Sequence, residues 1–220
     1  MSNAVIQLLV LAGIAIFLIL RLKAVLGTRE GFEKPPVAAP VPEGRAVRRD
    51  FEVIEGGPDR DITDHVSDGS DAARALAAMK QAEPSFSVGE FLQGARGAYE
   101  MILMAFEKGD LASVKPFLAS EVYDSFAEVV AAREAQGLTI TAEFIGLREL
   151  ALHGAEFDPA TGEGEIAVRY VGELISVARD SNGAIVEGDP KSPRKQRDVW
   201  TFARKMGASD PNWQLVATGE

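Results

Sequence analysis

The spacing of the apolar residues changes at Gly137, and this change constrains the fold more than any other feature of the chain. From Phe91 to Phe106, large apolar residues recur with the 3.6-residue period of an α-helix. Beyond Gly137 they alternate with polar residues, which is the period of a strand buried on one face. We therefore expect an α+β fold in which helices pack on the concave face of a curved antiparallel sheet.

Capping and turn residues give the expected boundaries of these elements. Ser87 and Glu90 form a capping box, and Phe86 and Phe91 stand at the two positions of a hydrophobic staple, so a helix begins here and ends at Gly109. A short helix is expected over 111–118, and Ser120 is expected to cap a longer one that ends at Gly137. Strands are expected over 138–144, 145–157, 163–179, 195–206 and 212–218, with bulges at Gly146 and Gly172.

The run from Ala4 to Leu20 is apolar except for Gln7, and Arg21 and Lys23 follow it. About 20 such residues cross the roughly 30 Å hydrocarbon core of a bilayer, and the run reaches that length with its flanks. A cleaved signal peptide is the competing interpretation, but it would carry its cations before the apolar stretch. We expect a transmembrane anchor over 1–26. The cations on its C-terminal side favour a single-pass protein whose following domain is cytoplasmic.

Residues 27–83 read as a flexible tether between the anchor and the folded domain. They contain Pro35, Pro36, Pro40 and Pro42 and few large apolar residues, a composition that stiffens the chain and cannot bury a core. A short helix is expected near 71–81, where helix-forming residues predominate. We expect residues 84–220 to form the domain and to fold alone.

Composition excludes several classes of function. The net charge is −10, and residues 84–220 carry thirteen basic and twenty-one acidic side chains, so nucleic acid is not an expected partner. The chain has no cysteine, and its two histidines, His65 and His153, are far apart in the sequence. We therefore expect no metal site and no cofactor.

An enzyme of the isomerase or dehydratase type remains an alternative, because a carboxylate buried in an apolar pocket can shuttle protons. No pairing of acids is visible from their spacing, so no catalytic residue is assigned. The acids and hydrogen-bond donors available for such a role are Glu100, Asp124, Glu143, Tyr99, Tyr123 and Tyr170.

Two groups of side chains are candidates for binding. Aromatic residues on the first helix and the last strands are expected to line a hydrophobic pocket, although ordinary core packing is the alternative; they are Phe91, Tyr99, Trp200, Phe202 and Trp213. A basic cluster follows Pro190 and surrounds Pro193; it comprises Lys191, Arg194, Lys195 and Arg197. These residues could contact anionic lipid headgroups or be part of a solvated loop.

Short motifs in the helices and in the last two strands resemble the start and the end of a Tim44-like domain. They are Phe91-Leu92-x-Gly94-Ala95-x-x-Ala98, Ala105-Phe106-x-x-Gly109-Asp110, Val122-Tyr123-x-x-Phe126, Val199-Trp200-x-Phe202-x-Arg204 and Asn212-Trp213-x-Leu215. The resemblance covers about residues 84–220, and the single-anchor layout resembles that of bacterial members. It implies a cone-shaped fold similar to nuclear transport factor two, a large apolar pocket and an association with inner-membrane lipid.

The resemblance and the residues together lead to one functional hypothesis. We expect a non-enzymatic scaffold, anchored in the bacterial inner membrane with its domain on the cytoplasmic face. The expected partners are membrane lipids, inner-membrane proteins or their complexes, and a lipid-like apolar ligand in the pocket. A chaperone adaptor of the import-motor type is a further alternative, which the domain alone does not establish.

Overall fold

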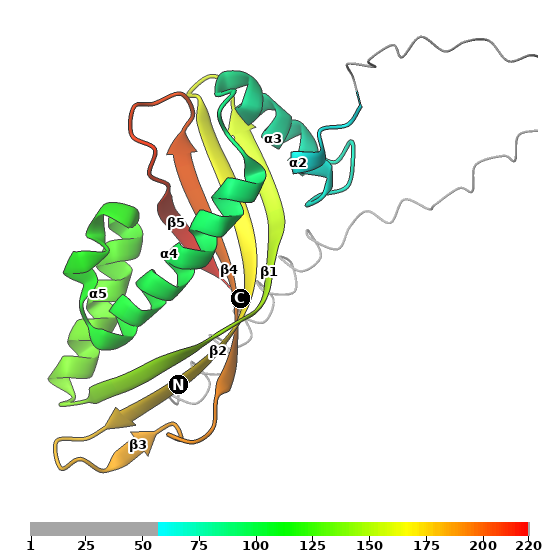
Figure 1. The fold of residues 1–220 in the computed structure, drawn as a ribbon. Coiled ribbons are helices and arrows are strands. Elements are labelled where there is room, and N and C mark those ends of the chain that lie inside the picture. The colour runs from blue at the N-terminus through cyan, green and yellow to red at the C-terminus, as the bar shows by residue number, and fades with distance from the viewer. Residues whose placement is uncertain (1–56, 220) are drawn as a thin grey trace, which may run out of the picture. The chain divides into compact units, whose positions relative to one another are not determined.

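A bent antiparallel sheet forms the frame of the domain. In the computed structural model, which describes residues 57–219, the strand order is β1-β2-β4-β5, and β3 pairs with the C-terminal end of β2. Helix α4, Val88–Lys108, crosses the concave side of this sheet (Figure 1). The expected α+β class, with helices packed on an antiparallel sheet, is confirmed. The strands are β1 Thr139–Asp158, β2 Glu163–Arg179, β3 Ile185–Glu187, β4 Arg194–Lys205 and β5 Gln214–Gly219.

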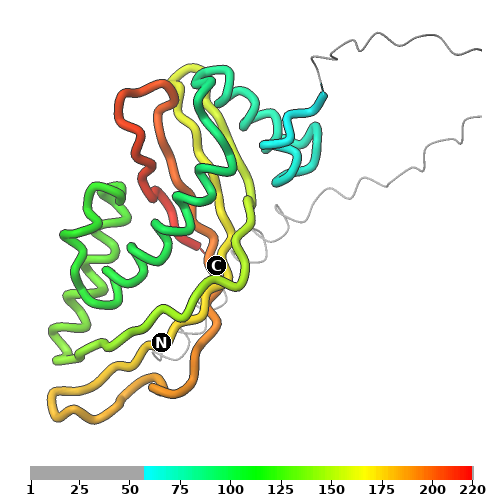
Figure 2. The backbone as a smooth tube through the Cα atoms, in the orientation of Figure 1, coloured from blue at the N-terminus to red at the C-terminus, as the bar shows by residue number. Residues whose placement is uncertain are grey.

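Irregularities in β1 accompany the bend of the sheet. The register between β1 and β2 shifts three times, between Phe144 and Gly146, after Leu147 and after Leu152. Gly146 has a φ of 151°, which side chains other than glycine rarely adopt. The predicted bulge at Gly146 is confirmed, and the two strands curve together along their length (Figure 2).

The register shift next to Gly172 has its extra residue in β1, between Leu147 and Glu149, and close packing explains the glycine itself. Gly172 pairs with Leu147 at the edge of this shift on one side, and regularly with Gln196 on the other. A Cβ at this position would lie 3.1 Å from the hydroxyl oxygen of Tyr99 and 3.6 Å from Phe144. The glycine therefore makes room for the Tyr99 ring against the sheet.

We expect Gly172→Ala to lower the free energy of unfolding by about 1–3 kcal/mol, because the added methyl group overpacks the contact with Tyr99. Urea denaturation measures the change. Gly154→Ala is the matched control, since this second strand glycine has no atom within 4 Å of the added Cβ. Equal changes in the two variants would contradict the packing argument.

Helix α4, Val88–Lys108, begins as the sequence predicts. Ser87 Oγ accepts a hydrogen bond from the Glu90 amide at 3.3 Å, and Gly109 ends the helix with a φ of 74°. One side of the helix is buried among core residues and carries the predicted apolar stripe, which includes Phe91, Leu92, Ala95, Tyr99 and Ile102.

A carboxylate from another helix completes the cap of α4. Asp61 in α2, Arg60–Thr63, accepts hydrogen bonds from the amides of Val88 at 2.8 Å and Gly89 at 2.9 Å. Lys80 Nζ lies 2.7 Å from a carboxylate oxygen of Asp61. Burial opposes the charge, but Lys80 and the two amides hold the pKa of Asp61 well below its usual range. Lys80 belongs to helix α3, Asp71–Ala82, so these bonds join α2 and α3 to the start of α4.

Helix α3, Asp71–Ala82, packs into the core, whereas the sequence analysis places it in the tether. Leu76 and Met79 are 0% exposed, and a Cβ at Gly164 would lie only 3.0 Å from the Met79 methyl group. The helix therefore packs on the sheet, mainly against β1, and Met79 reaches Gly164 in β2. Within the described residues, the core therefore includes side chains of α2 and α3, which precede the expected boundary at residue 84.

Two short 3₁₀-helices follow α4, where the sequence predicts one helix. They are η1, Leu111–Ser113, and η2, Lys115–Phe117. Pro116 supplies no backbone N–H, which disfavours a continuous helix through this position.

Helix α5, Ser120–Ala135, follows with a start that differs from the prediction. Ser120 is its first helical residue rather than its cap, and Ala119 occupies the cap position without a side-chain hydrogen bond. The Ala119 amide instead donates to the carbonyl oxygen of Leu215 at 2.9 Å. This bond ties the start of α5 to β5.

The expected anchor over 1–26 lies outside the described residues, as does most of the tether. Within residues 57–219, no helix combines the length and the apolar character needed to span a bilayer.

Candidate functional site

An apolar groove of about 490 Å³ lies between α4 and the segment that leads into β5. The floor of the groove includes the small residues Gly94, Gly97 and Ala98 of α4. Its large apolar lining residues come from four separate parts of the chain; they are Phe86, Phe91, Met101, Phe117, Phe202 and Trp213.

Trp213 is held in this groove from both sides. Its ring centroid lies 4.8 Å from that of Phe91 and 5.9 Å from that of Phe86. The Arg204 guanidinium stands 5.2 Å from the Trp213 ring centroid, and Glu83 binds the same guanidinium at 2.8 Å. The aromatic wall is therefore fixed by an ion pair as well as by packing.

The five residues expected to line a hydrophobic pocket separate into two groups. Phe91, Phe202 and Trp213 line the apolar groove. Tyr99 and Trp200 do not line it, because they lie in the core with ring centroids 4.7 Å apart. That these residues bind a ligand stays a prediction.

The core tyrosines have internal hydrogen-bond partners. Tyr99 stacks on Tyr170 with ring centroids 4.3 Å apart, and its hydroxyl donates to Asp198 Oδ2 at 2.6 Å. The Tyr170 hydroxyl donates to the Ala95 carbonyl oxygen at 3.1 Å. Burial raises the pKa of both phenols, and the neighbouring Asp198 carboxylate raises the pKa of Tyr99 further. Both tyrosines therefore stay neutral and join α4 to the sheet.

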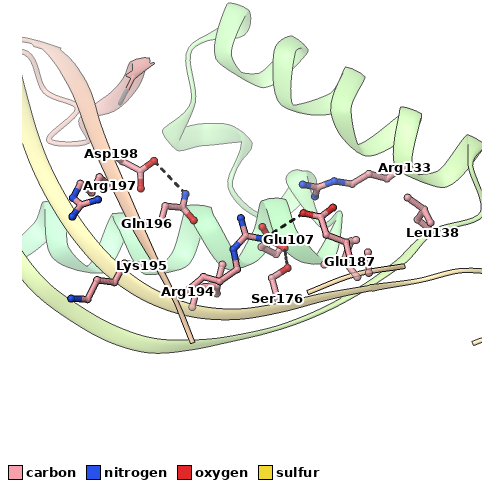
Figure 3. Close-up of a pocket in the computed structure, with 13 residues that line it drawn as sticks. Glu107, Arg133, Leu138, Ser176, Glu187, Arg194, Lys195, Gln196, Arg197 and Asp198 are labelled. Atoms are coloured by element: carbon pink, nitrogen blue, oxygen red, sulfur yellow. Dashed lines mark hydrogen bonds and ion pairs between the residues drawn. The ribbon is translucent and has the colours of Figure 1, made fainter. Parts of the chain in front are cut away.

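A second pocket, here called the polar cavity, has a volume of about 640 Å³ and is bordered by α4, α5, β3 and the first half of β4 (Figure 3). Ser176 Oγ donates to Glu107 at 2.7 Å, and Arg194 pairs with Glu187 at 3.4 Å. The floor includes apolar residues from the sheet, among them Leu174 and Ala178.

Three residues of the predicted basic cluster line the polar cavity. Arg194, Lys195 and Arg197 belong to β4 rather than to a loop, because the pairing of β4 with β2 extends to Arg194. Lys191 precedes the strand and is not part of the lining. Contact with lipid headgroups stays a prediction for all four.

Arg133 of α5 adds a cation that the sequence analysis missed. Its guanidinium carbon lies 4.5 Å from the ring centroid of Phe106, an arrangement that holds the planar group in place. Its Nη1 atom is shielded from solvent and has no hydrogen-bond partner among the described residues. In Figure 3 the side chain reaches from α5 into the polar cavity.

The sequence of residues 72–220 matches the family model of the Tim44-like domain. The chain belongs to the Tim44-like domain family. The match begins inside α3, in agreement with the packing of this helix against the sheet.

Two individual proteins resemble this Tim44-like chain. The human mitochondrial import inner membrane translocase subunit TIM44 is 23% identical over 168 residues, which cover 71% of this chain and 36% of the human protein. The chain thus spans about a third of that relative. The crystal structure of the intermembrane space region of the chloroplast protein ARC6 matches 58% of this chain and 93% of its own, with 12% identity and a TM-score of 0.36.

The acids considered for catalysis do not assemble a site in this Tim44-like domain. Glu100, Asp124 and Glu143 are exposed, and none lines the apolar groove or the polar cavity. Asp198 does lie beside a tyrosine, but its carboxylate oxygens accept hydrogen bonds from Tyr99 and Gln196. The hydrogen bond from Tyr99 holds α4 against β4.

The histidines are also separate from both pockets. His65 follows α2 and His153 lies within β1, and both are exposed. Within the part of the chain that the structure describes, no three acidic or histidine side chains are grouped as metal ligands would be.

Proposed function

We propose that this Tim44-like domain is a non-enzymatic binding module whose apolar groove holds an apolar helical segment of a membrane-protein partner. The observation that carries the proposal is the groove itself, where aromatic side chains face a helix with two exposed glycines. The name of the human relative, an inner-membrane translocase subunit, supports a setting at an inner membrane.

The surface of α4 favours a helix as the occupant. Gly94, Gly97 and Met101 recur at intervals of three and four residues, so they lie along one face of α4. A Cβ at either glycine would meet no atom within 4 Å, and Met101 is 39% exposed. Small residues let a second helix approach closely, and the neighbouring aromatic rings would contact its apolar side chains.

The charges at the rim favour a partner segment with basic flanks. Glu90 borders the groove with a carboxylate that no ion pair among the described residues neutralises, whereas Glu83 is paired with Arg204. Apolar segments of membrane proteins commonly carry lysine or arginine at their cytoplasmic ends. The proposal therefore places the domain beside the cytoplasmic face of the membrane, held there by the predicted anchor over 1–26.

Filling the groove should block binding without damage to the fold. The probe is a labelled amphipathic peptide with leucine on one face and lysine on the other. We expect Gly97→Leu to weaken its binding at least about tenfold, which is equivalent to about 1.4 kcal/mol. Fluorescence anisotropy with the purified full chain measures the dissociation constant. Gly97→Ala is the matched control, because it gives the same gain in helix propensity but leaves the groove open.

Two results would contradict the proposed function. One is equal binding of a peptide with the same composition but no apolar face. The other is recovery of the chain with a small apolar molecule that Gly97→Leu displaces and that the chain converts to a product, which would support the alternative of an enzyme.

A further inference from the structure

The first half of β4 has an unpaired edge. Strand β4 runs over Arg194–Lys205 and pairs with β2 along one side over its whole length. On its other side, β5 pairs only with Val199–Ala203. Among the described residues, the stretch Arg194–Asp198 therefore has no neighbouring strand on that side.

This edge faces the polar cavity. All five residues from Arg194 to Asp198 line the cavity, although successive side chains of a strand point to opposite faces of its sheet. A lining of consecutive residues is typical of a strand that presents its backbone edge to the space. The N–H and C=O groups of such an edge can pair with an added strand.

The cavity combines the free edge with basic groups that have few partners. Its acids are largely engaged within the domain, since Glu107 accepts from Ser176 and Asp198 accepts from Tyr99. The ion pair of Arg194 with Glu187 is 3.4 Å long and exposed, and such surface pairs contribute little. The basic residues of the lining are Arg133, Arg194, Lys195 and Arg197.

We propose that the edge of β4 over Arg194–Asp198 binds an extended acidic peptide segment of a protein partner as an added strand. The peptide backbone pairs with the β4 edge, and one of its carboxylates contacts the Arg133 guanidinium that lines the polar cavity. Its other acidic side chains contact Arg194 and its neighbours in the strand. This site is independent of the apolar groove and of the function proposed for it.

The backbone edge distinguishes this partner from an anionic lipid headgroup. A headgroup would use the cations alone and would leave the N–H and C=O groups of the edge without partners. An extended peptide uses both, because strand addition supplies main-chain hydrogen bonds as well as side-chain contacts.

Binding of a defined peptide to the full chain tests the proposal. The probe is an eight-residue peptide of alternating glutamate and valine with blocked ends, and its controls carry lysine for glutamate or N-methyl groups on every central amide. We expect only the unmodified acidic peptide to bind and to slow amide hydrogen exchange in residues 194–198. We expect Arg194→Glu and Arg133→Gln each to weaken its binding about tenfold.

Arg148→Glu is the matched control variant and should leave the affinity unchanged. Arg148 is 66% exposed and paired with Glu173, whereas Arg194 is 65% exposed and paired with Glu187. If Arg148→Glu and Arg194→Glu weaken peptide binding equally, the effect is one of net charge alone, and the proposal is overturned. Equal binding of the N-methylated peptide would exclude strand addition. Binding of anionic vesicles that Arg194→Glu abolishes, with no binding of the peptide, would assign the site to lipid headgroups instead.

Discussion

A fragment of residues 84–220 is expected to lose most of the stability of a fragment of residues 57–220. The missing part includes Leu76 and Met79, which are fully buried, and Ile62, which is 5% exposed. Burial of each such side chain stabilises a fold by about 1.5–3 kcal/mol. The summed loss is comparable to the total stability of an ordinary domain, about 5–15 kcal/mol. Urea denaturation followed by near-ultraviolet circular dichroism measures the difference.

Single substitutions in the longer fragment separate packing from chain length. We expect Leu76→Ala to cost about 2–5 kcal/mol because it leaves a cavity beneath α3. Arg74→Ala on the same helix should cost less than about 0.5 kcal/mol, since Arg74 is exposed. A cooperative unfolding transition in residues 84–220 with the stability of the longer fragment would restore the boundary expected from the sequence.

The sequence predicts the local elements of this domain well because their signals are local. The cap at Ser87, the end of α4 at Gly109 and the bulge at Gly146 each depend on a few neighbouring residues. The packing of α3 against the sheet does not depend on neighbouring residues alone. Its contact between Met79 and Gly164 joins residues far apart in the chain, and an alanine-rich helix carries little signal of what it packs against.

The sequence predicts three of the residues that line the apolar groove, Phe91, Phe202 and Trp213, but not how the groove is arranged. Phe91 and Tyr99 are both predicted to line the pocket and both are buried on α4, but only Phe91 lines the groove. Periodicity places both on the buried side and does not show that the groove follows the face of α4 with Gly94, Gly97 and Met101, which runs past Tyr99. Gly94 and Gly97 stand three positions apart in the sequence, and this spacing of small residues is the signal of the groove that the prediction lacks.

The polar cavity shows the same limit of local reasoning. The expected strand over 195–206 agrees within one residue with β4, but its position at the edge of the sheet depends on its partners. Arg133 lies on α5, and only the fold brings it beside β4. A free strand edge is a property of the sheet order, so no pattern within β4 itself could predict it.

Removal of the carboxylate of Glu83 should have the second large effect on stability. Both Glu83 oxygens accept from Arg204 Nη2, at 2.9 and 2.8 Å, and Oε2 also accepts from the Gly207 amide at 2.8 Å. The Arg204 side chain is only 7% exposed. We expect Glu83→Ala to cost about 3–5 kcal/mol in urea denaturation, because it leaves a buried guanidinium without its counter-charge.

The pH dependence of stability should identify the same carboxylate. Burial opposes its charge, but the hydrogen bonds from Arg204 and Gly207 lower the pKa of Glu83 below its usual value. A lowered pKa in the folded state means that Glu83 stabilises the fold above the unfolded value of about 4.3, and that this contribution is lost as the pH falls below it. The wild-type chain should therefore lose more stability than Glu83→Gln between about pH 5 and pH 3.

Two further variants distinguish a buried ion pair from a surface one. Glu187→Ala breaks the exposed pair with Arg194, in which Glu187 is 74% exposed, and should cost less than about 1 kcal/mol. Combining Glu83→Ala with Arg204→Met should cost less than Glu83→Ala alone, because no unpaired charge remains buried. Similar small losses in Glu83→Ala and Glu187→Ala would contradict this account. Since Arg204 also stands over Trp213, the loss of Glu83 should weaken peptide binding in the apolar groove as well, which links the ion pair to the wall it supports.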